Sequence, residues 1–276
     1  MIIIDRKIGF INLTHIFLNK EHNPNLAKKK IVVHVYSRIS LQNFKEGVTY
    51  HIDLQKDKDE LLKKMSKMNR YMLRRAEKEP YEFIVIENPT DDNLKEFQRF
   101  YNKFILTKKT NNINNFRLNT LKLLRNKGAL VFTKLQNING EALCYQIHII
   151  DEDLVLNLYT CTAAWIQNRP DLKQQIRFAN RYLLWRNILF FKKRGFKIYD
   201  FGGRTEISQI NKFKEDFGFE EVPTYHGHET QLIVGEIIVN LNNLKNVIIN
   251  KIRRNFRCVS IVFRLLSWDV RKNRKA

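Results

Sequence analysis

Three short apolar segments separated by turn residues constrain this fold more than any other feature of the sequence. The segments span residues 129–135, 142–150 and 154–160, and the turn sequences N-I-N-G and D-E-D separate them. Short loops of this kind connect antiparallel strands. The next strand-like segment, residues 196–200, follows after a crossover of about 35 residues, and connections this long join parallel strands. The sequence therefore predicts a mixed sheet with helices on both faces.

Helix and strand signals extend on both sides of this region. Residues 57–79 contain no Gly or Pro, end at Pro80, and predict one long helix. The remaining patterns predict helices at 90–108, 116–126, 171–194 and 208–216, and strands at 31–36, 48–54, 81–87, 221–225 and 231–239. Over residues 81–240 the order is β-α-α-β-β-β-α-β-α-β-β. We class this fold as α/β (an α+β mixed sheet), with a central sheet flanked by helices.

The charge of the chain narrows the range of partners. Its 49 Lys and Arg residues exceed its 28 Asp and Glu residues, which gives a net charge of +21. A protein this basic is attracted to polyanions, which include nucleic acid, an anionic membrane and phosphate-rich substrates. The charge alone does not choose among them. A hydrophobic content of 43% excludes a wholly disordered chain.

The cysteines and histidines do not form a metal-site or disulfide pattern. Cys144, Cys161 and Cys258 lie far apart, which argues against a disulfide framework and favours a reducing compartment. His226 and His228 have no Cys, Asp or Glu partner at ligand spacing, so we expect no metal. No apolar stretch reaches the roughly 20 residues of a membrane-spanning helix. We expect a cytoplasmic protein, either free or peripheral at the inner membrane face.

Three sequence motifs in the same order carry a family resemblance. They are M-N-R-Y-M-L-R-R-A-E-K at 68–78, K-K-R-G-F-K-I-Y-D-F-G-G at 192–203 and I-N-K-F-K-E-D-F-G-F at 210–219. Together they resemble the FemAB family of bacterial aminoacyltransferases, and the element order is similar to that of GNAT-superfamily acyltransferases. The resemblance covers about residues 57–240. It implies a GNAT-like acyltransferase fold in a single-domain member.

The resemblance also divides the chain. It implies an acyltransferase domain at residues 57–240, preceded by N-terminal strands at 1–60 that are either a remnant of a first domain or an extension of the sheet. A basic amphipathic segment follows at 245–276, with ten Lys and Arg residues and one acidic residue. Bulky apolar residues interleave with these charges, as in helices that lie on anionic membranes. The alternatives are a helix docked on its own domain and a tRNA-binding tail.

The resemblance implies an acyl donor, either acyl-CoA or aminoacyl-tRNA, and no metal. Acyl-CoA enzymes of this superfamily carry a pyrophosphate loop at the start of the long helix. Gln174 and Ala179 match that pattern, whereas Arg177 replaces its central glycine. An arginine near a helix N-terminus can still bind phosphate through its charge. Both donors therefore remain open.

Acyl transfer to an amine requires a base, a group that stabilises the oxyanion, and positioning of both substrates. Asp200 ends a central strand and is a candidate catalytic group or, alternatively, a turn carboxylate that binds the Gly202 or Gly203 amide. The motif match implies that Lys214 lies close to the transferred group, and the alternative is an exposed lysine. Its position beside an apolar helix face predicts a place at a pocket rim. Tyr159 is a candidate general acid.

Further residues are candidates for binding. Gly202 and Gly203 allow backbone amides to approach a ligand, or else form an ordinary turn. Arg70, Arg74 and Arg204 are candidates for substrate phosphates.

Three kinds of function fit these features. The leading hypothesis is an N-acyltransferase that transfers an aminoacyl or acyl group to an amine of a cell-envelope precursor, part of peptidoglycan or a surface polysaccharide. Its partners would be a lipid- or nucleotide-linked precursor, tRNA, and an anionic membrane surface bound through residues 245–276. A related alternative is an acetyl-CoA-dependent N-acetyltransferase acting on a sugar or small amine. The others are a non-catalytic basic nucleic-acid-binding protein and a peripheral membrane scaffold.

Overall fold

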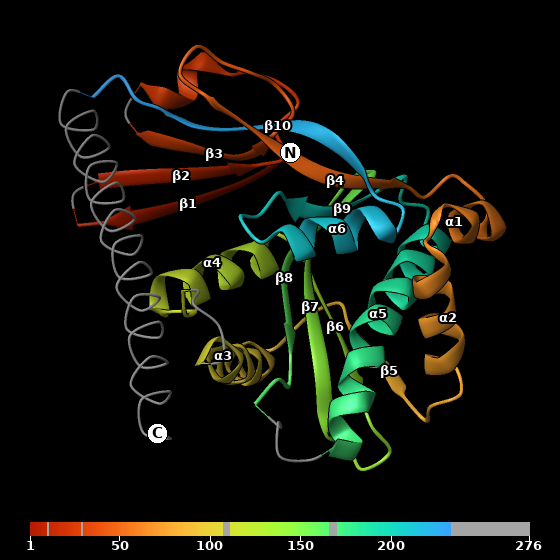
Figure 1. Cartoon of the computed structure of the whole chain (residues 1–276). Coiled ribbons are helices and arrows are strands. Elements are labelled where there is room, and N and C mark those ends of the chain that lie inside the picture. Colours follow the sequence, from red (N-terminus) through yellow and green to blue (C-terminus); the bar gives the residue numbers. More distant parts are fainter. Residues whose placement is uncertain (10, 29, 107–110, 166–169, 233–276) are drawn as a thin grey trace, which may run out of the picture. The chain divides into compact units, whose positions relative to one another are not determined.

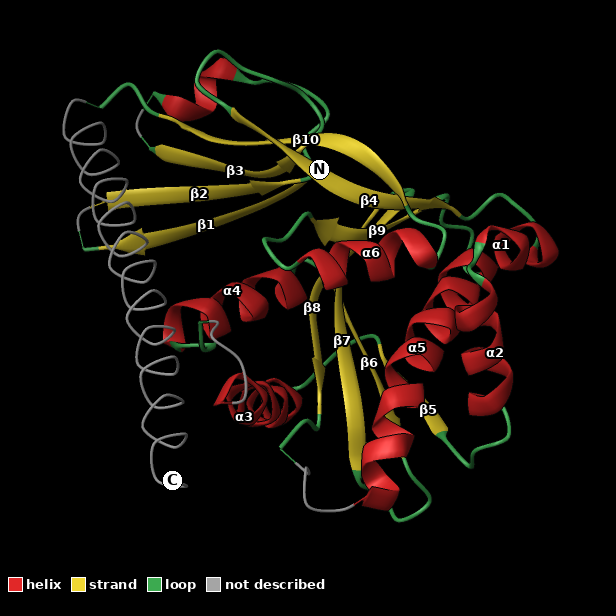
Figure 2. Cartoon of the chain, in the orientation of Figure 1, coloured by secondary structure: helices red, strands yellow, loops and turns green. Residues whose placement is uncertain are grey.

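The computed structural model describes residues 1–9, 11–28, 30–106, 111–165 and 170–232, and the side chains of 170–174 are not described. The strands are β1 (Ile2–Ile8), β2 (Ile11–Phe17), β3 (Ile31–Ser37), β4 (Lys45–Asp53), β5 (Glu82–Ile86), β6 (Leu130–Gln136), β7 (Ala142–Asp151), β8 (Leu154–Thr162), β9 (Ile198–Gly203) and β10 (Glu220–Glu229). The helices are the 3-10 helix η1 (Pro24–Ala27), α1 (Lys58–Lys64), α2 (Lys67–Ala76), α3 (Asp91–Leu106), α4 (Asn115–Asn126), α5 (Pro170–Lys193) and α6 (Ser208–Asp216). Figures 1 and 2 show these elements.

One ten-stranded sheet has the order β1-β2-β3-β10-β4-β9-β8-β7-β6-β5. The ladder from β5 through β8 is antiparallel, and β4 pairs antiparallel with both β9 and β10. The pair formed by β8 and β9 is parallel, and α5 provides its crossover. The mixed sheet predicted from the turn spacing is confirmed.

Contacts between Cα atoms divide the chain into two compact units. The first consists of Met1–Arg6, Thr14–His22 and Val33–His228, and it contains all of β4 to β9 and the helices α1 to α6 of the described residues. The second consists of Lys7–Leu13, Asn23–Val32 and Glu229–Ala276. Within the second unit, the Gln231 amide donates to the Ala27 carbonyl. Every site residue discussed below belongs to the first unit.

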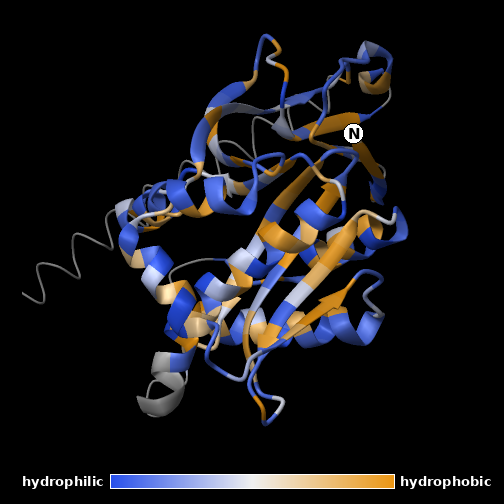
Figure 3. Ribbon diagram, turned by 90° about the vertical axis from the view of Figure 1, so that its right-hand side faces the viewer, coloured by the Kyte–Doolittle hydropathy of each residue, from blue (hydrophilic) through white to orange (hydrophobic). Residues whose placement is uncertain are grey.

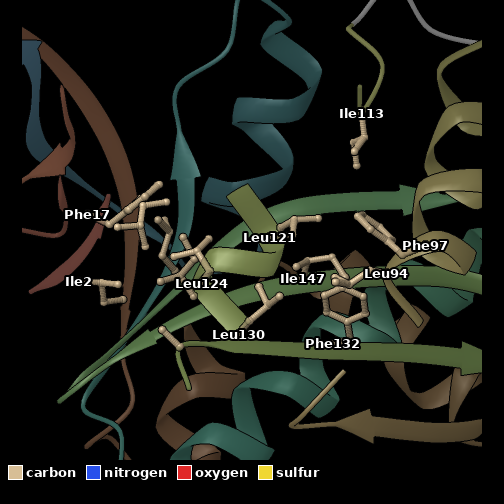
Figure 4. Packing of buried hydrophobic residues seen from close by; sticks show 14 of the residues in the cluster. Ile2, Phe17, Leu94, Phe97, Ile113, Leu121, Leu124, Leu130, Phe132 and Ile147 are labelled. Carbon is tan, nitrogen blue, oxygen red and sulfur yellow. The ribbon is translucent and has the colours of Figure 1, made fainter. Parts of the chain in front are cut away.

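Helices cover both faces of the sheet in the first unit. Because side chains alternate along a strand, Leu130 and Phe132 pack on one face and Val131 on the other. On the first face, α3 and α4 contribute Leu94, Phe97, Leu121 and Leu124 to a buried cluster (Figure 4). On the opposite face, α1 and α5 contribute Leu61 and Trp185, and Phe217, the residue after α6, joins them. Figure 3 shows apolar colouring along the strands and mixed colouring on the helices.

The helix predicted over 57–79 is two helices. Met65 has an extended backbone, with ψ of 147°, and the Ser66 side chain then caps α2 by accepting a hydrogen bond from the Asn69 amide. Neither Gly nor Pro marks this position in the sequence. β1 and β2 add to the predicted strands; Asp5, Arg6 and Lys7 interrupt the apolar run of β1, whereas β2 contains no charged residue. Among the described helices, none is both long and apolar enough to cross a membrane.

Candidate functional site

The pairing of the two parallel strands stops where the candidate residues begin. The register of β8 and β9 runs from Leu154 opposite Ile198 to Leu156 opposite Asp200, although both strands continue further. The ladder between β8 and β7 shifts at the same place, so that Leu158 is an extra, bulged residue. Asp200 therefore lies at the last position of β9 that pairs with β8. Gly202 and Gly203, here called the Gly202–Gly203 turn, end β9, and Gly203 still pairs with Thr49 of β4.

The two amides of this turn are held on one side. The Gly202 amide donates to Asp200 Oδ1 at 2.7 Å, and the Gly203 amide donates to the Tyr36 hydroxyl at 3.3 Å. Gly202 has φ of +80°, and a Cβ at this position would lie 3.3 Å from the Asn157 carbonyl oxygen. Both the backbone angle and the close approach favour glycine. Because both amides already have partners, their predicted contact with a ligand stays a prediction.

Asp200 is buried and anchored by several donors. Its residue is 2% exposed. Oδ1 also accepts a hydrogen bond from Thr49 Oγ1, and Oδ2 lies 3.2 Å from His51 Nε2. Thr49 and His51 alternate along β4, so both project to the face that Asp200 occupies. The carboxylate is thus fixed as a turn anchor, and one of its oxygens remains directed at a histidine.

Lys214 holds the same turn from the other side. Its Nζ donates to the Gly202 carbonyl at 2.9 Å and to the Gly203 carbonyl at 2.6 Å. Nζ also lies 4.6 Å from the centre of the Tyr50 ring and 5.6 Å from that of Phe201. The residue is only 3% exposed, so the predicted position at a pocket rim is wrong. The exposed alternative is wrong as well, because α6 packs this lysine against the sheet.

Burial changes the protonation of Lys214. Removal from water lowers its pKa from 10.5 to about 8, and the nearby Asp200 carboxylate opposes that shift. An ammonium group has three donors, and the two carbonyls occupy two of them. One donor therefore remains for a group that binds at this turn.

Tyr159 lies on the face of the sheet that α3 covers. Its ring packs at 5.2 Å from Tyr101 and at 5.9 Å from Phe97, measured between ring centres. Burial raises its pKa, and the positive charge of Arg117 opposes this rise. Burial also raises the pKa of Tyr36, and the charges of Asp200 and Tyr159 add to that rise. The Tyr159 phenol is protonated at neutral pH, as a general acid requires.

The predicted phosphate-binding residues lie at two places in the first unit: Arg70 and Arg74 on α2, and Arg204 directly after Gly203. Arg70 Nη1 donates to the carbonyls of Leu62, Lys63 and Met65, so its described contacts are with the end of α1. Arg204 is 57% exposed at its side chain, with its guanidinium 3.4 Å from Glu221 Oε1. Arg74 is exposed on α2. Their roles toward a substrate stay predictions.

The predicted pyrophosphate residues lie on α5. Arg177 is exposed, and its carbonyl accepts a hydrogen bond from Arg181, whose guanidinium lies 5.1 Å from the centre of the Phe213 ring. This connects Arg177 to the residue that precedes Lys214. Ala179 is fully buried in the cluster with Leu183, and the Gln174 side chain lies outside the described residues. The predicted role of Arg177 toward a pyrophosphate stays a prediction.

Sequence reasoning missed four residues around Asp200: Tyr36, Thr49, His51 and His226. The alternation V-T-Y-H-I-D in β4 was a usable signal for Thr49 and His51, because it places both polar side chains on one face. Tyr36 gave no signal, since its contact with Gly203 spans 167 residues. Within the described parts of the chain, no three His, Cys, Asp or Glu residues are grouped as metal ligands.

Comparisons with known proteins agree with this architecture. No family model matches the sequence, and no curated protein matches it. Solved structures do match. FemX has a TM-score of 0.57 at 14% identity, over 81% of this chain and 83% of that chain. The C-terminal domain of a putative lysylphosphatidylglycerol synthetase from Agrobacterium fabrum has a TM-score of 0.54 at 13% identity, over 88% and 85%.

A third structure, L-PGS from Bacillus licheniformis, has a TM-score of 0.53 at 13% identity, over 88% of this chain and 85% of that chain. At such identities the likeness shows the fold alone. The chain shares the fold of these structures, and the FemAB-like fold that the three motifs predicted is confirmed.

Proposed function

We propose that this protein is an N-acyltransferase that transfers an aminoacyl or acyl group to an amine of a cell-envelope precursor. One observation carries the proposal. At the end of the parallel strand pair, a Gly-Gly turn lies between a buried carboxylate, Asp200, and a buried ammonium, Lys214. Buried charges are costly unless hydrogen bonds or opposite charges compensate for desolvation. Their position beside one turn, in a fold shared with FemX, supports acyl transfer.

The proposed roles follow from charge and position. Nucleophilic attack by an amine on an activated carbonyl places negative charge on the carbonyl oxygen. Lys214 has one uncommitted donor near the turn and is suited to stabilise that oxyanion. Tyr159, protonated at neutral pH, is suited to give a proton to the leaving group. Asp200 fixes the turn so that these groups keep their geometry.

The donor in this proposal carries phosphate. Arg177 is exposed on α5, and Arg181, one turn further along, is partly buried with its Nε donating to Asn69 Oδ1; no carboxylate of the described residues forms an ion pair with either. Such a pair suits the pyrophosphate of acyl-CoA as well as the backbone of tRNA. The net charge of +21 favours a large polyanionic donor, and an aminoacyl-tRNA meets that condition better.

The acceptor in this proposal is linked to a lipid or a nucleotide. The names of the similar structures include a lysylphosphatidylglycerol synthetase, which is consistent with an acceptor at a membrane surface. The basic segment at 245–276 lies outside the described residues, and its binding to anionic membranes remains a sequence-based prediction. Co-sedimentation of the full chain and a 1–244 truncation with anionic vesicles tests it. Equal sedimentation of both would remove the segment from this role.

Mass spectrometry of envelope precursors tests the function. Precursors are extracted from cells with the protein, without it, and with the Lys214→Met variant. We expect a mass increment equal to one acyl or aminoacyl group that is present only with the parent protein. Identical precursor masses in all three strains would contradict envelope acylation.

A second candidate function, non-catalytic RNA binding, is favoured by the exposed face of α2. This face presents basic residues together with Tyr71, which is 50% exposed, and Met68, which is 59% exposed. The exposed basic residues are Lys67, Arg74, Arg75 and Lys78. Exposed aromatic and basic side chains on one helix are suited to stacking and phosphate contact. Binding of RNA that depends on these residues, in a protein without transferase activity, would favour this function.

A further inference from the structure

Asp200 is directed at a side chain that the proposed function leaves unused. His51 Nε2 lies 3.2 Å from Asp200 Oδ2, and the imidazole is 19% exposed while the carboxylate is 2% exposed. The other carboxylate oxygen already accepts hydrogen bonds from Thr49 Oγ1 and the Gly202 amide. The arrangement is a buried, immobilised carboxylate that holds one edge of a histidine ring whose side chain still reaches the surface.

This contact fixes the tautomer of His51. An ionised carboxylate only accepts hydrogen bonds, so the ring proton resides on Nε2 and the lone pair on Nδ1. For Nδ1 the described residues provide no hydrogen-bond partner. A neutral imidazole held in this way presents a basic nitrogen with a fixed direction. This is the role of the carboxylate in acid–base pairs of hydrolases.

Other titratable groups surround the pair on every element packed against it. His226 on β10 accepts a hydrogen bond from the Tyr36 amide on β3, and both residues feel the charge of Asp200. Lys214 on α6 feels the same charge from the other side of the turn. On β10, Glu220 is the Cα partner of His51, and its carboxylate pairs with Lys64. Of the two histidines, His226 already uses Nδ1 as an acceptor, whereas His51 does not.

We propose that His51 is the general base of the transfer reaction and that Asp200 orients it. The inference rests on the proposed N-acyltransferase function. His51 would then touch the nucleophilic amine, while Asp200 would act through His51 and through the turn. Asp200 Oδ1 accepts the hydrogen bonds that hold the turn, and Oδ2 faces His51.

The proton balance of the step needs no further reactant. The amine nitrogen attacks the acyl carbon, a C–N bond forms, and the amine proton passes to His51 Nδ1. The C–O bond of an ester donor or the C–S bond of a thioester then breaks. The leaving oxygen or sulfur takes the proton back from Nδ1, directly or through Tyr159. Throughout, the Nε2–H group of His51 keeps its hydrogen bond to Asp200. The products are an amide and an alcohol or thiol.

Kinetics of three variants test this role. We expect His51→Gln to lower kcat about 100-fold or more with KM within about threefold, because a positioned base contributes in that range. Added imidazole should restore at least about tenfold of the lost rate to His51→Ala and leave the parent unchanged. His228→Gln is the control, since it removes another partly buried histidine of β10. A His51→Gln variant with near-parental kcat would overturn the inference and leave the proposed function intact.

A merely structural His51 is separated from a base by the rescue and by the pH profile. A structural role would alter stability or KM, and free imidazole would not restore turnover. A base predicts that the acidic limb of the kcat profile disappears in His51→Gln but persists in His228→Gln. Persistence of that limb in His51→Gln would assign it to another group and overturn the inference.

Chemical modification provides a readout that does not depend on activity. Diethyl pyrocarbonate acylates accessible neutral imidazole nitrogens, and peptide mass spectrometry locates the product. We expect carbethoxylation of His51 in the full-length parent, at a rate comparable to that of exposed His22, and none at fully buried His148. A His51 that stays unmodified while His22 reacts would overturn the inference. If the parent transfers no acyl group from any donor, the proposed function fails by itself, and this measurement still reports on His51.

Discussion

The two sides of the Gly202–Gly203 turn hold opposite charges by different means. On one side, Asp200 is 2% exposed and receives hydrogen bonds from a hydroxyl and an amide, with a histidine at its second oxygen. On the other side, Lys214 is 3% exposed and has only two neutral carbonyls and two aromatic rings. Both oxygens of the carboxylate therefore have polar partners in the protein. Burial of the ammonium lowers its pKa to about 8.

This difference separates a structural charge from a chemical one. A carboxylate held by several donors keeps neighbouring groups in place. A lysine with a lowered pKa can change its protonation near neutral pH and responds strongly to a new negative charge beside it. Removal of Asp200 should therefore mainly disturb structure, and removal of Lys214 should mainly disturb chemistry.

The largest expected effect is on stability when Asp200 is lost. Asp200→Ala leaves Thr49, His51 and the Gly202 amide without their acceptor in a buried place. We expect it to lower the free energy of unfolding by about 3–5 kcal/mol. Urea denaturation followed by circular dichroism measures this. Asp92→Asn, an exposed change in α3, is the control and should cost under about 1 kcal/mol. An equal loss of the free energy of unfolding in both variants would contradict the structural role of Asp200.

The lysine side predicts a pH dependence of stability. Between pH 8 and 10.5 the unfolded lysine is protonated and the folded one is largely not, so the unfolded state binds more protons. The free energy of unfolding of the parent should therefore rise with pH relative to Lys214→Met. The lowered pKa corresponds to a total of about 3 kcal/mol over this window. Urea denaturation of both proteins at pH 7.5, 9 and 10.5 checks it. A pH-independent difference would refute the lowered pKa.

The affinity for the acyl donor tests whether Arg177 belongs to the same site as Lys214. Loss of a charged hydrogen bond costs about 1.5–3 kcal/mol, which raises the dissociation constant by about 10- to 100-fold. We expect this change for Arg177→Gln with the true donor. Lys193→Gln, an exposed change on the same helix, should bind the donor as the parent does. Isothermal titration with acetyl-CoA and with aminoacyl-tRNA measures it. Parental affinity for both donors in Arg177→Gln would exclude Arg177 from the site.

The smallest expected effect isolates the close approach at the turn. Gly202 and Gly140 have φ of +80° and +75°, but only Gly202 would bring a Cβ close to other atoms, 3.3 Å from the Asn157 carbonyl oxygen. Alanine should cost about 1 kcal/mol at either position through backbone strain. We expect Gly202→Ala to cost about 1 kcal/mol more than Gly140→Ala. Equal melting temperatures would show that β8 moves aside without cost.

Local patterns were enough to predict most of this fold. Turn residues and apolar periodicity placed β6, β7 and β8 within two residues of their ends, and the crossover length predicted the parallel pair with β9. The break between α1 and α2 was missed because it depends on Ser66, whose amide also donates to the Asp216 carbonyl of α6. Contacts between distant segments of this kind leave no trace in local spacing.

The site was predictable only in part, for the same reason. Motifs located Asp200 and Lys214, and the structure connects both to one turn. Burial of Lys214 depends on Tyr50 and Phe201, which come from two other strands. The His51 contact depends on the register of β4 with β9, where His51 is the Cα partner of Asp200. That register pairs residues 149 positions apart, so local sequence spacing does not show it.

Acyl transfer in a purified system tests the central claim most directly. The parent, Lys214→Met and Asp92→Asn are each incubated with lipid-linked or nucleotide-linked envelope precursors and with acyl-CoA or charged tRNA, and the products are weighed by mass spectrometry. We predict one added acyl or aminoacyl group with the parent and with Asp92→Asn, and a rate at least about 100-fold lower with a folded Lys214→Met. Equal product with all three proteins, or no product with the parent for any donor, would contradict a transfer site at the Gly202–Gly203 turn.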